Sequence, residues 1–268
     1  MRRLAIASSF ALALSTATVA ASAEPAFDTS WTTDGAITAG SFTTLVLLNL
    51  ALDKQAPPPA CASRPCGPLG DGARPYDRGW DLATYGTALL AVGGAMTPSS
   101  SRWAAGDGSG ADTARSSLVL AEAIGVTLAV TELTKIAVPR YRPFLAFEPR
   151  PGASRVSQDA SASFWSGHSA LTFAAAAIGA FDACRVDSPV GCAAPAIGLH
   201  AFAAATAWGR VMAGKHHASD VLVGAAVGSG LGALVAMLHA PDGRERGRGA
   251  GQALAGSQVF MLGASWVF

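Results

Sequence analysis

The sequence predicts an all-α protein, a bundle of six helices embedded in a membrane. Two observations carry this prediction. The apolar segments have the length of helices rather than of strands, and stretches rich in Pro and Gly separate them. In addition, 50% of the 268 residues are hydrophobic and only 14% are charged, whereas a soluble domain carries roughly a quarter charged residues. The predicted helices are rich in Ala and Gly, small residues that let neighbouring helices approach closely, as in membrane bundles.

The N-terminal residues 1–23 have the features of a signal peptide. Arg2 and Arg3 form a basic start, residues 4–20 are apolar or small, and Ala21-Ser22-Ala23 fits a small-x-small cleavage site. An uncleaved anchor helix is the alternative. In either case we expect export from a bacterial-type cytoplasm to the cell envelope, either into a membrane, most simply the inner one, or into the periplasm.

The predicted helices follow one another with clear breaks. Asp34 suits the N-cap of the first helix, and Pro98 ends the second. Pro139 ends the third, because proline cannot donate the helical hydrogen bond. The connection over 139–165 is too long for a simple link, and such loops are usually functional. The predicted helices cover residues 34–52, 80–96, 111–137, 166–183, 194–213 and 218–239.

These features divide the chain into three predicted parts. Behind the signal peptide we expect one helical domain over 30–240, followed by a Gly/Arg-rich linker and a short apolar tail over 241–268. The net charge of +1 gives no indication of a nucleic-acid partner. The predicted helices are at or just under the ~20 residues that cross a bilayer. A membrane is therefore the expected partner.

The four cysteines form two local pairs, Cys61/Cys66 and Cys184/Cys192. Each pair would close a short loop, so two disulfides in an oxidising compartment are expected. Metal binding is the alternative, but the spacings are not those of a zinc site and no His lies beside either pair. In a six-helix path the two pairs lie at opposite ends of the bundle. If both were oxidised, a wholly periplasmic protein would be favoured over a membrane-spanning one.

The first candidate motif for chemistry is Ser166-Gly167-His168, where the long loop meets the fourth predicted helix. Ser166 suits the N-cap, and Gly167 permits close approach of the backbone. The free N–H groups and the positive end of the helix would then face an anion. His168 lies in the same turn. By itself this motif is equally consistent with an ordinary capped helix.

The second motif joins Lys135 to Arg142, seven residues later and across the break at Pro139. Pro143 restricts the backbone of Arg142. A guanidinium offers forked donors to phosphate oxygens, and an ammonium offers a movable point charge. The alternative is that these are ordinary charges at a helix end or at a membrane border.

The third motif consists of Arg210, His216 and Asp220. Residues 216 and 220 are four apart and share a face of a helix. A carboxylate there can keep one imidazole nitrogen as N–H and leave the other free as a nucleophile. His217 competes for this role, because it is three residues from Asp220. A solvated helix start is the alternative for the whole motif.

Together these motifs resemble the three-part signature of the type 2 phosphatidic acid phosphatase and vanadium haloperoxidase superfamily. The resemblance rests on Lys-x6-Arg-Pro, Ser-Gly-His and Arg-x5-His-x3-Asp in this order, on a frame of six helices over about residues 30 to 240. It implies that His216 is the nucleophile and forms a phosphohistidine, that Asp220 orients it, and that His168 protonates the leaving group. The resemblance also implies a set of phosphate-binding residues: Lys135, Arg142, Ser166, Gly167 and Arg210. No metal or cofactor is expected for this reaction.

By this resemblance the protein is a phosphatase of the phosphatidic acid phosphatase type 2 kind, acting on a lipid phosphate or diphosphate such as phosphatidate or a polyprenyl diphosphate. The alternatives are a soluble periplasmic acid phosphatase acting on small phosphoesters, a vanadium-dependent haloperoxidase, and a membrane protein that binds lipid headgroups without turnover. Two positions depart from the signature: Trp165 stands where it has Pro, and Gly209 where it has Ser. We expect a less rigid loop from the first and one phosphate hydrogen bond fewer from the second.

Overall fold

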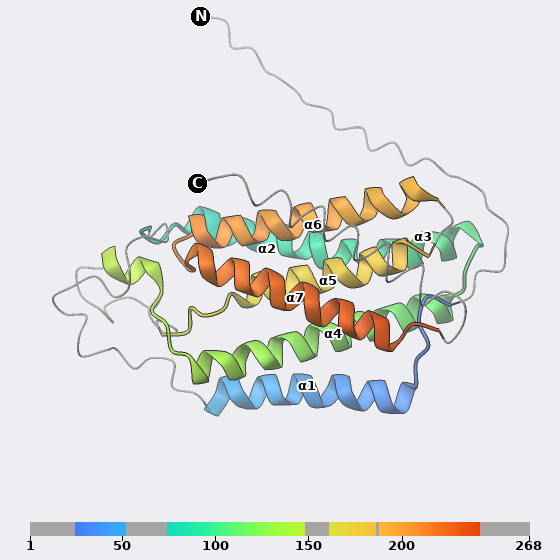
Figure 1. The fold of residues 1–268 in the computed structure, drawn as a ribbon, viewed down its shortest axis with the longest axis horizontal. Helices are drawn as coiled ribbons and strands as arrows, with labels where there is room; N and C mark the ends of the chain where they lie inside the picture. Colours follow the sequence, from blue (N-terminus) through green and yellow to red (C-terminus); the bar gives the residue numbers. More distant parts are fainter. Residues whose placement is uncertain (1–24, 52–73, 148–160, 186–187, 242–268) are drawn as a thin grey trace, which may run out of the picture.

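The computed structural model describes residues 25–51, 74–147, 161–185 and 188–241. Within these ranges the protein contains seven α-helices and no strand. The long helices lie side by side along one axis (Figure 1). In chain order the elements are α1 (Trp31–Ala51), α2 (Arg78–Gly94), α3 (Thr97–Ala105), α4 (Gly110–Ala137), the 3-10 helix η1 (Pro143–Phe147), α5 (Gly167–Ala183), α6 (Pro189–Met212) and α7 (Ala218–Leu238).

The all-α prediction is confirmed, but the count of six helices is wrong for the described part of the chain. Each predicted helix is present, and α3 is additional. It lies between the predicted helices over 80–96 and 111–137, where no helix was expected. Pro98 does follow the second helix, as predicted, but it also lies in the first turn of α3, where its missing N–H breaks no helical hydrogen bond. Gly106, with φ of 81°, ends α3.

Helix α5 lies at the centre of the bundle and packs against α7, α6 and α4. Its closest neighbour is α7, whose Gly224, Gly228 and Gly232 face the α5 backbone. A Cβ at any of these three positions would overlap backbone atoms of α5, so only glycine permits this approach. One result is that the first turns of the two helices are joined, because the Ser166 N–H donates to the Asp220 carbonyl (3.1 Å).

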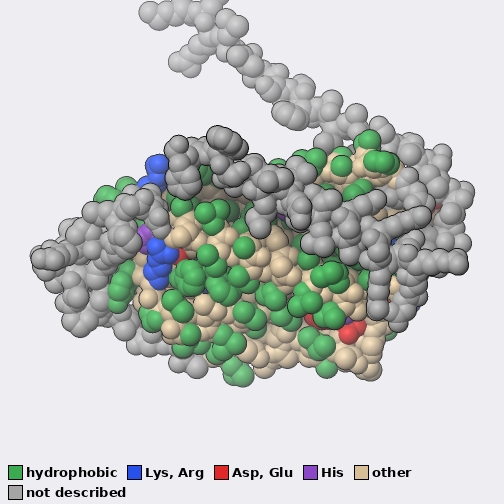
Figure 2. All heavy atoms as spheres, in the orientation of Figure 1, with side chains coloured by type: hydrophobic (Ala, Val, Ile, Leu, Met, Phe, Trp, Pro, Cys, Tyr) green, Lys and Arg blue, Asp and Glu red, His purple; other side chains and the backbone are tan. Residues whose placement is uncertain are grey.

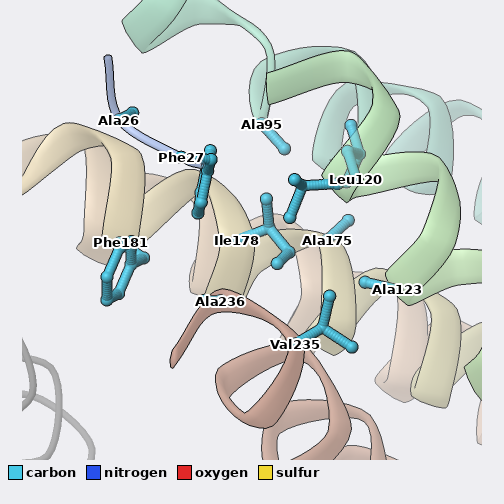
Figure 3. Close-up of a cluster of buried hydrophobic side chains, with 11 residues drawn as sticks. Ala26, Phe27, Ala95, Leu120, Ala123, Ala175, Ile178, Phe181, Val235 and Ala236 are labelled. Atoms are coloured by element: carbon cyan, nitrogen blue, oxygen red, sulfur yellow. The ribbon is translucent and has the colours of Figure 1, made fainter. Parts of the chain in front are cut away.

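The largest cluster of buried apolar side chains lies toward the other end of α5 (Figure 3). Phe27, from the segment before α1, stacks on Phe181 of α5 with the ring centroids 5.5 Å apart. Ile178, Leu120 and Val235 complete the cluster from α5, α4 and α7. This end of the bundle is therefore a packed core that also holds the segment preceding α1.

Among the helices that the structure describes, three (α4, α6 and α7) are long and apolar enough to cross a membrane, judged by length and composition. Large apolar side chains are also exposed along the bundle, and Figure 2 shows them spread over the visible face. Examples on α1, α2, α6 and α7 are Leu50, Leu89, Ile197, Leu222 and Leu238. These features support the predicted association with a membrane.

The second predicted disulfide is confirmed: Cys184 and Cys192 are bonded and link the end of α5 to the start of α6. The first pair, Cys61 and Cys66, lies outside the described residues. So do the predicted signal peptide over 1–23 and all but the first residue of the linker and tail over 241–268. The division of the chain into these three parts therefore stays a prediction.

Candidate active site

The three motifs, which are far apart in the sequence, come together at one end of the bundle. This is the end at which α4 finishes and α5 and α7 begin (Figure 1). Basic and His side chains gather on the surface of the same end (Figure 2). Every predicted site residue belongs to a helix end or to a turn at this place: Lys135 (end of α4), Arg142 (before η1), Ser166, Gly167 and His168 (start of α5), Arg210 (end of α6), His216 (turn) and Asp220 (first turn of α7).

His216 is buried, and both of its ring nitrogens have neighbours. Nδ1 lies 2.8 Å from the carbonyl oxygen of Ser163, which can only accept, so Nδ1 carries the proton. Nε2 then has a free lone pair, and it lies 3.3 Å from a guanidinium nitrogen of Arg142. The ring of His216 is thus held in one tautomer, with the unprotonated Nε2 directed at Arg142.

Asp220 occupies a different position from the one expected for an orienting carboxylate. Its Oδ2 lies 3.8 Å from His216 Nδ1, which is beyond a good hydrogen bond. The carboxylate is fully buried and accepts from Arg140 (2.6 Å), from the Ser163 hydroxyl (2.5 Å) and from the His217 N–H (2.9 Å). Asp220 therefore holds together the segments that surround His216, and Ser163 takes the direct contact with the ring.

His217, the competing histidine, is directed elsewhere. Its Nε2 lies 3.1 Å from the carbonyl oxygen of Tyr141, and its backbone rather than its ring contacts Asp220. The structure thus favours His216 for contact with the basic residues of the site.

The start of α5 provides backbone donors next to Lys135. The Ser166 hydroxyl accepts from the Ser169 N–H (3.3 Å), so it caps the helix. The N–H groups of Gly167 and His168 follow in the first turn, where no carbonyl of the same helix can accept from them. A Cβ at Gly167 would lie 3.6 Å from Lys135 Nζ. The ammonium also pairs with Glu132 at 2.6 Å. This arrangement suits an anion that bridges the helix start and the lysine.

Arg210 is held by residues of α2 that the sequence analysis missed. Its guanidinium forms an ion pair with Asp81 and donates to the Thr84 hydroxyl (3.2 Å). Asp81 also accepts from the Tyr76 hydroxyl (2.9 Å). Although burial raises the pKa of the Asp81 carboxyl, Arg210, Tyr76 and Lys215 together hold that pKa below its usual range. The Arg210 Nε atom is buried and has no hydrogen-bond partner, so one donor of this arginine is available to a ligand.

Burial and nearby cationic side chains lower the pKa values of both histidines of the site. Burial, together with Arg210, Lys135 and Arg142, lowers the pKa of His168 to about 3. Burial and the same three cations, with Arg142 the strongest of them, hold the pKa of His216 well below its usual value. Both imidazoles are therefore neutral at pH 7 before a ligand binds. An anion with two negative charges would offset the repulsion from the cations and raise both pKa values.

The two departures from the family signature have structural counterparts. The Trp165 indole N–H donates to the Thr131 hydroxyl (2.8 Å), so this loop is tied to α4 despite the missing proline. Gly209 lies directly against α2, and a Cβ there would come within 2.5 Å of Thr84 Cγ2. The methyl group of Thr84 occupies the space into which the expected serine would project. The expectation of a less rigid loop did not take this hydrogen bond of the indole into account.

No curated protein and no solved structure matches the chain significantly. The family model of the PAP2 superfamily does match it, over residues 116–244. This segment contains all three motifs, whereas Asp81 and Thr84 of α2 lie before it. In agreement with the resemblance found in the motifs, this segment of the chain is therefore similar to the PAP2 superfamily.

Proposed function

We propose that the protein is a metal-independent phosphatase that hydrolyses a lipid phosphate or diphosphate through a phosphohistidine on His216. The observation that carries this proposal is the geometry of the His216 ring. Nδ1 is held as N–H by the Ser163 carbonyl, and the Nε2 lone pair faces Arg142 within an electropositive site. Nucleophilic attack on a phosphoryl group requires a neutral, oriented imidazole beside positively charged side chains.

In the first step, Nε2 of His216 attacks the phosphorus, and the bond from phosphorus to the leaving oxygen breaks. Arg142, Arg210, Lys135 and the N–H groups at the start of α5 stabilise the charge on the phosphoryl oxygens. His168 takes up a proton from solvent when the anionic substrate raises its pKa. It then gives that proton to the leaving oxygen.

In the second step, water attacks the phosphohistidine. The now neutral His168 accepts a proton from this water, the bond between phosphorus and Nε2 breaks, and phosphate leaves. His216 returns to its starting tautomer. During both steps Nδ1 keeps its proton on the Ser163 carbonyl, and the Asp220 carboxylate, 3.8 Å away, stabilises the positive ring.

The apolar surface supports a lipid as the substrate. Three helices have the length and composition to cross a membrane, and large apolar side chains such as Leu89 and Leu222 are exposed along the bundle. A substrate with an acyl or prenyl tail could approach the phosphate site along such a surface. The Cys184–Cys192 disulfide supports an oxidising location and is the observation that favours the second candidate, a periplasmic acid phosphatase for small phosphoesters.

Phosphate release from lipid and from small soluble substrates, in EDTA, tests the proposal. His216→Gln should lose at least about 10³-fold in kcat, and acid-quenched wild-type protein should carry one labile phosphate per chain. His217→Gln is the matched control, because it removes the neighbouring buried histidine. Equal release by wild type and His216→Gln would overturn the assignment. Binding of phosphate without a trapped phosphohistidine would instead indicate a non-catalytic headgroup-binding protein.

A further inference from the structure

A second cluster of titratable side chains lies at the opposite end of the bundle from the phosphate site. It consists of Asp34 in the first turn of α1, Glu122 of α4 and His239, which caps the end of α7. The three side chains lie close to one another, and α1 begins and α7 finishes at the same end of the bundle (Figure 1). All three residues are buried. The proposed phosphatase mechanism uses none of them.

The His239 ring is oriented so that a lone pair faces the two carboxylates. Nδ1 lies 2.9 Å from the Val235 carbonyl oxygen, so Nδ1 carries the proton in the neutral ring and Nε2 does not. Nε2 lies 3.5 Å from Asp34 Oδ1 and 3.5 Å from Glu122 Oε2. The lone pair of Nε2 and the two carboxylate oxygens therefore lie close together.

Glu122 supplies a second, independent observation at this cluster. Its Oε2 is buried and has no hydrogen-bond partner, and the residue is only 4% exposed. A buried carboxylate oxygen without a partner is costly. By contrast, Asp34 Oδ2 accepts from the Ser30 N–H (2.7 Å), so Asp34 keeps Oδ1 for the cluster. A cation at the centre would satisfy both carboxylates and the imidazole together.

We propose that Asp34, Glu122 and His239 bind a structural divalent transition-metal ion, with Zn²⁺ the best match. Zinc bonds of about 2.1 Å at tetrahedral angles separate the ligand atoms by roughly 3.4 Å, and the two measured separations are 3.5 Å. All three ligand atoms lie within 4.8 Å of one another. The Val235 carbonyl is the kind of outer partner that orients a metal-bound histidine. Water would complete the coordination.

The ion would connect α1, at the start of the domain, to α4 and to the end of α7. Asp34 belongs to α1, which packs mainly on α4, and the segment before α1 is also joined to α7, because the Asp28 N–H donates to the His239 carbonyl (2.8 Å). One ion held by α1, α4 and α7 would therefore stabilise the fold. The phosphatase reaction at the other end would not need it.

The principal rival is a proton. An imidazolium at His239 between two carboxylates would also satisfy the three groups. The two cases differ in what changes the stability of the protein. If a metal ion binds, the Tm rises with the concentration of that metal, whereas if a proton binds, the Tm depends on pH and not on the metal.

The test uses the purified full chain, stripped with EDTA and exchanged into metal-free buffer at pH 7. Zn²⁺ is titrated by calorimetry, bound metal is counted by elemental analysis, and thermal unfolding is followed. We expect one Zn²⁺ per chain and a rise in Tm of about 5 °C or more at saturation. Mg²⁺ should not compete at equal concentration, because it holds its water and prefers octahedral oxygen sites.

Two isosteric changes locate the site. Glu122→Gln and His239→Gln should each weaken Zn²⁺ binding by at least about 10²-fold. His200→Gln is the matched control, because the His200 Nδ1 lies 2.8 Å from the carbonyl oxygen four residues earlier, as in His239, but on α6. It should bind Zn²⁺ like the wild type. A His168→Gln/His216→Gln double variant should also retain the ion, which excludes binding by the histidines of the phosphate site.

A measurement on the wild type covers the case in which a variant fails to fold. Co²⁺ bound in place of Zn²⁺ should give the intense visible absorption of a tetrahedral site with nitrogen and oxygen ligands. Absence of Zn²⁺ binding by the wild type, or equal affinity in Glu122→Gln, would overturn the proposal. So would a Tm that responds to pH but not to Zn²⁺, which would assign the cluster to a proton.

Discussion

The Nδ1 atom of His216 lies 2.8 Å from the carbonyl oxygen of Ser163. A backbone carbonyl neither titrates nor donates, so it fixes the imidazole tautomer at every pH at which the protein is folded. The carboxylate that the motif offers for this task, Asp220, lies 3.8 Å away and is occupied by Arg140, by the Ser163 hydroxyl and by the His217 N–H. In the proposed mechanism, the Ser163 carbonyl therefore orients the His216 ring, and the Asp220 carboxylate stabilises its positive charge.

This division predicts a moderate effect of Asp220→Asn on turnover. Where a carboxylate alone fixes the tautomer of a catalytic histidine, its conversion to an amide costs about 10⁴-fold. Here the Ser163 carbonyl still fixes the tautomer, so we expect a loss in kcat of about 10²-fold. Steady-state kinetics on a phosphate ester would measure it, with Asp112→Asn at the start of α4 as the control. A loss as large as that of His216→Gln would show that Asp220 is the true orienting group.

Substitutions of Asp220 should also lower the free energy of unfolding, and by different amounts for Ala and for Asn. Asp220→Ala leaves the buried donors of Arg140, Ser163 and His217 without their acceptor. We expect it to lower the free energy of unfolding by about 3–5 kcal/mol, as for a broken buried ion pair. Asp220→Asn retains an oxygen acceptor and should cost clearly less. Denaturant unfolding of both variants measures this difference, and equal destabilisation would contradict it.

The lowered pKa of His168 predicts how stability depends on pH. The folded protein keeps this imidazole neutral down to about pH 3, whereas in the unfolded chain it takes up a proton near pH 6.5. Below pH 6.5 the unfolded state therefore binds more protons than the folded state. This contribution to stability is full above that pH and decreases as the pH falls from about 6.5 toward 3. Its slope cannot exceed ~1.4 kcal/mol per pH unit, because the two states differ by at most one proton at this ring.

Thermal unfolding at pH 7 and pH 5 checks this sign. The wild type should lose more Tm between the two pH values than His168→Gln does, because the variant lacks the titrating ring. Saturating tungstate, as a phosphate mimic, should reduce the wild-type difference, since a bound anion offsets the charges of Arg210, Lys135 and Arg142. Identical differences in the wild type and the variant would contradict a lowered pKa at His168.

The helices and the motifs could be predicted from the sequence because both depend on local signals. Pro139 ends α4 beyond Ala137 as expected, and the Ser166 cap begins α5. Helix α3 was missed because its sequence is polar and because Pro98 was interpreted only as a stop. Helix α6 begins at Pro189 rather than at 194, since Ser188 caps it and proline is well suited to the first turn.

The supporting residues of the site could not be predicted, because their partners are distant in the sequence. Asp81 and Arg210 are 129 positions apart, and Ser163 and Asp220 are 57 apart. A weak signal did exist for Asp81, which is the charged residue that follows Arg78 at the start of an otherwise apolar helix. Spacing rules connect residues on one helix face, and they carry no information about which helix lies opposite.

The Trp165 indole predicts that the loop before α5 depends on one hydrogen bond. Trp165→Phe keeps an aromatic ring but removes the donor to the Thr131 hydroxyl. We expect a loss of about 0.5–1.5 kcal/mol in the free energy of unfolding and a lower kcat, because Ser166, Gly167 and His168 follow directly. Trp208→Phe is the control, since Trp208 is 61% exposed on α6. Equal effects of the two changes would show that the bond does not position the loop.

The contact between Gly209 and Thr84 predicts that restoring the serine of the family signature is harmful in this chain. In Gly209→Ser the new Cβ would meet Thr84 Cγ2 at 2.5 Å, and overpacking of this kind costs about 1–3 kcal/mol. It should also lower kcat, because Thr84 accepts a hydrogen bond from Arg210. Gly198→Ser on the same helix is the matched control, since nothing lies within 4 Å of a Cβ there.

Thr84→Ser should rescue Gly209→Ser, because it removes the methyl group that obstructs the new side chain and keeps the hydroxyl that contacts Arg210. A double-mutant cycle on the free energy of unfolding and on kcat measures this coupling, which we expect to be favourable by about 1 kcal/mol or more. Additive effects of the two substitutions would mean that α6 and α2 move apart to accommodate the serine at little cost in free energy. In that case the glycine would not be required by the packing of α6 on α2, and the missing serine would be a loss for phosphate binding alone.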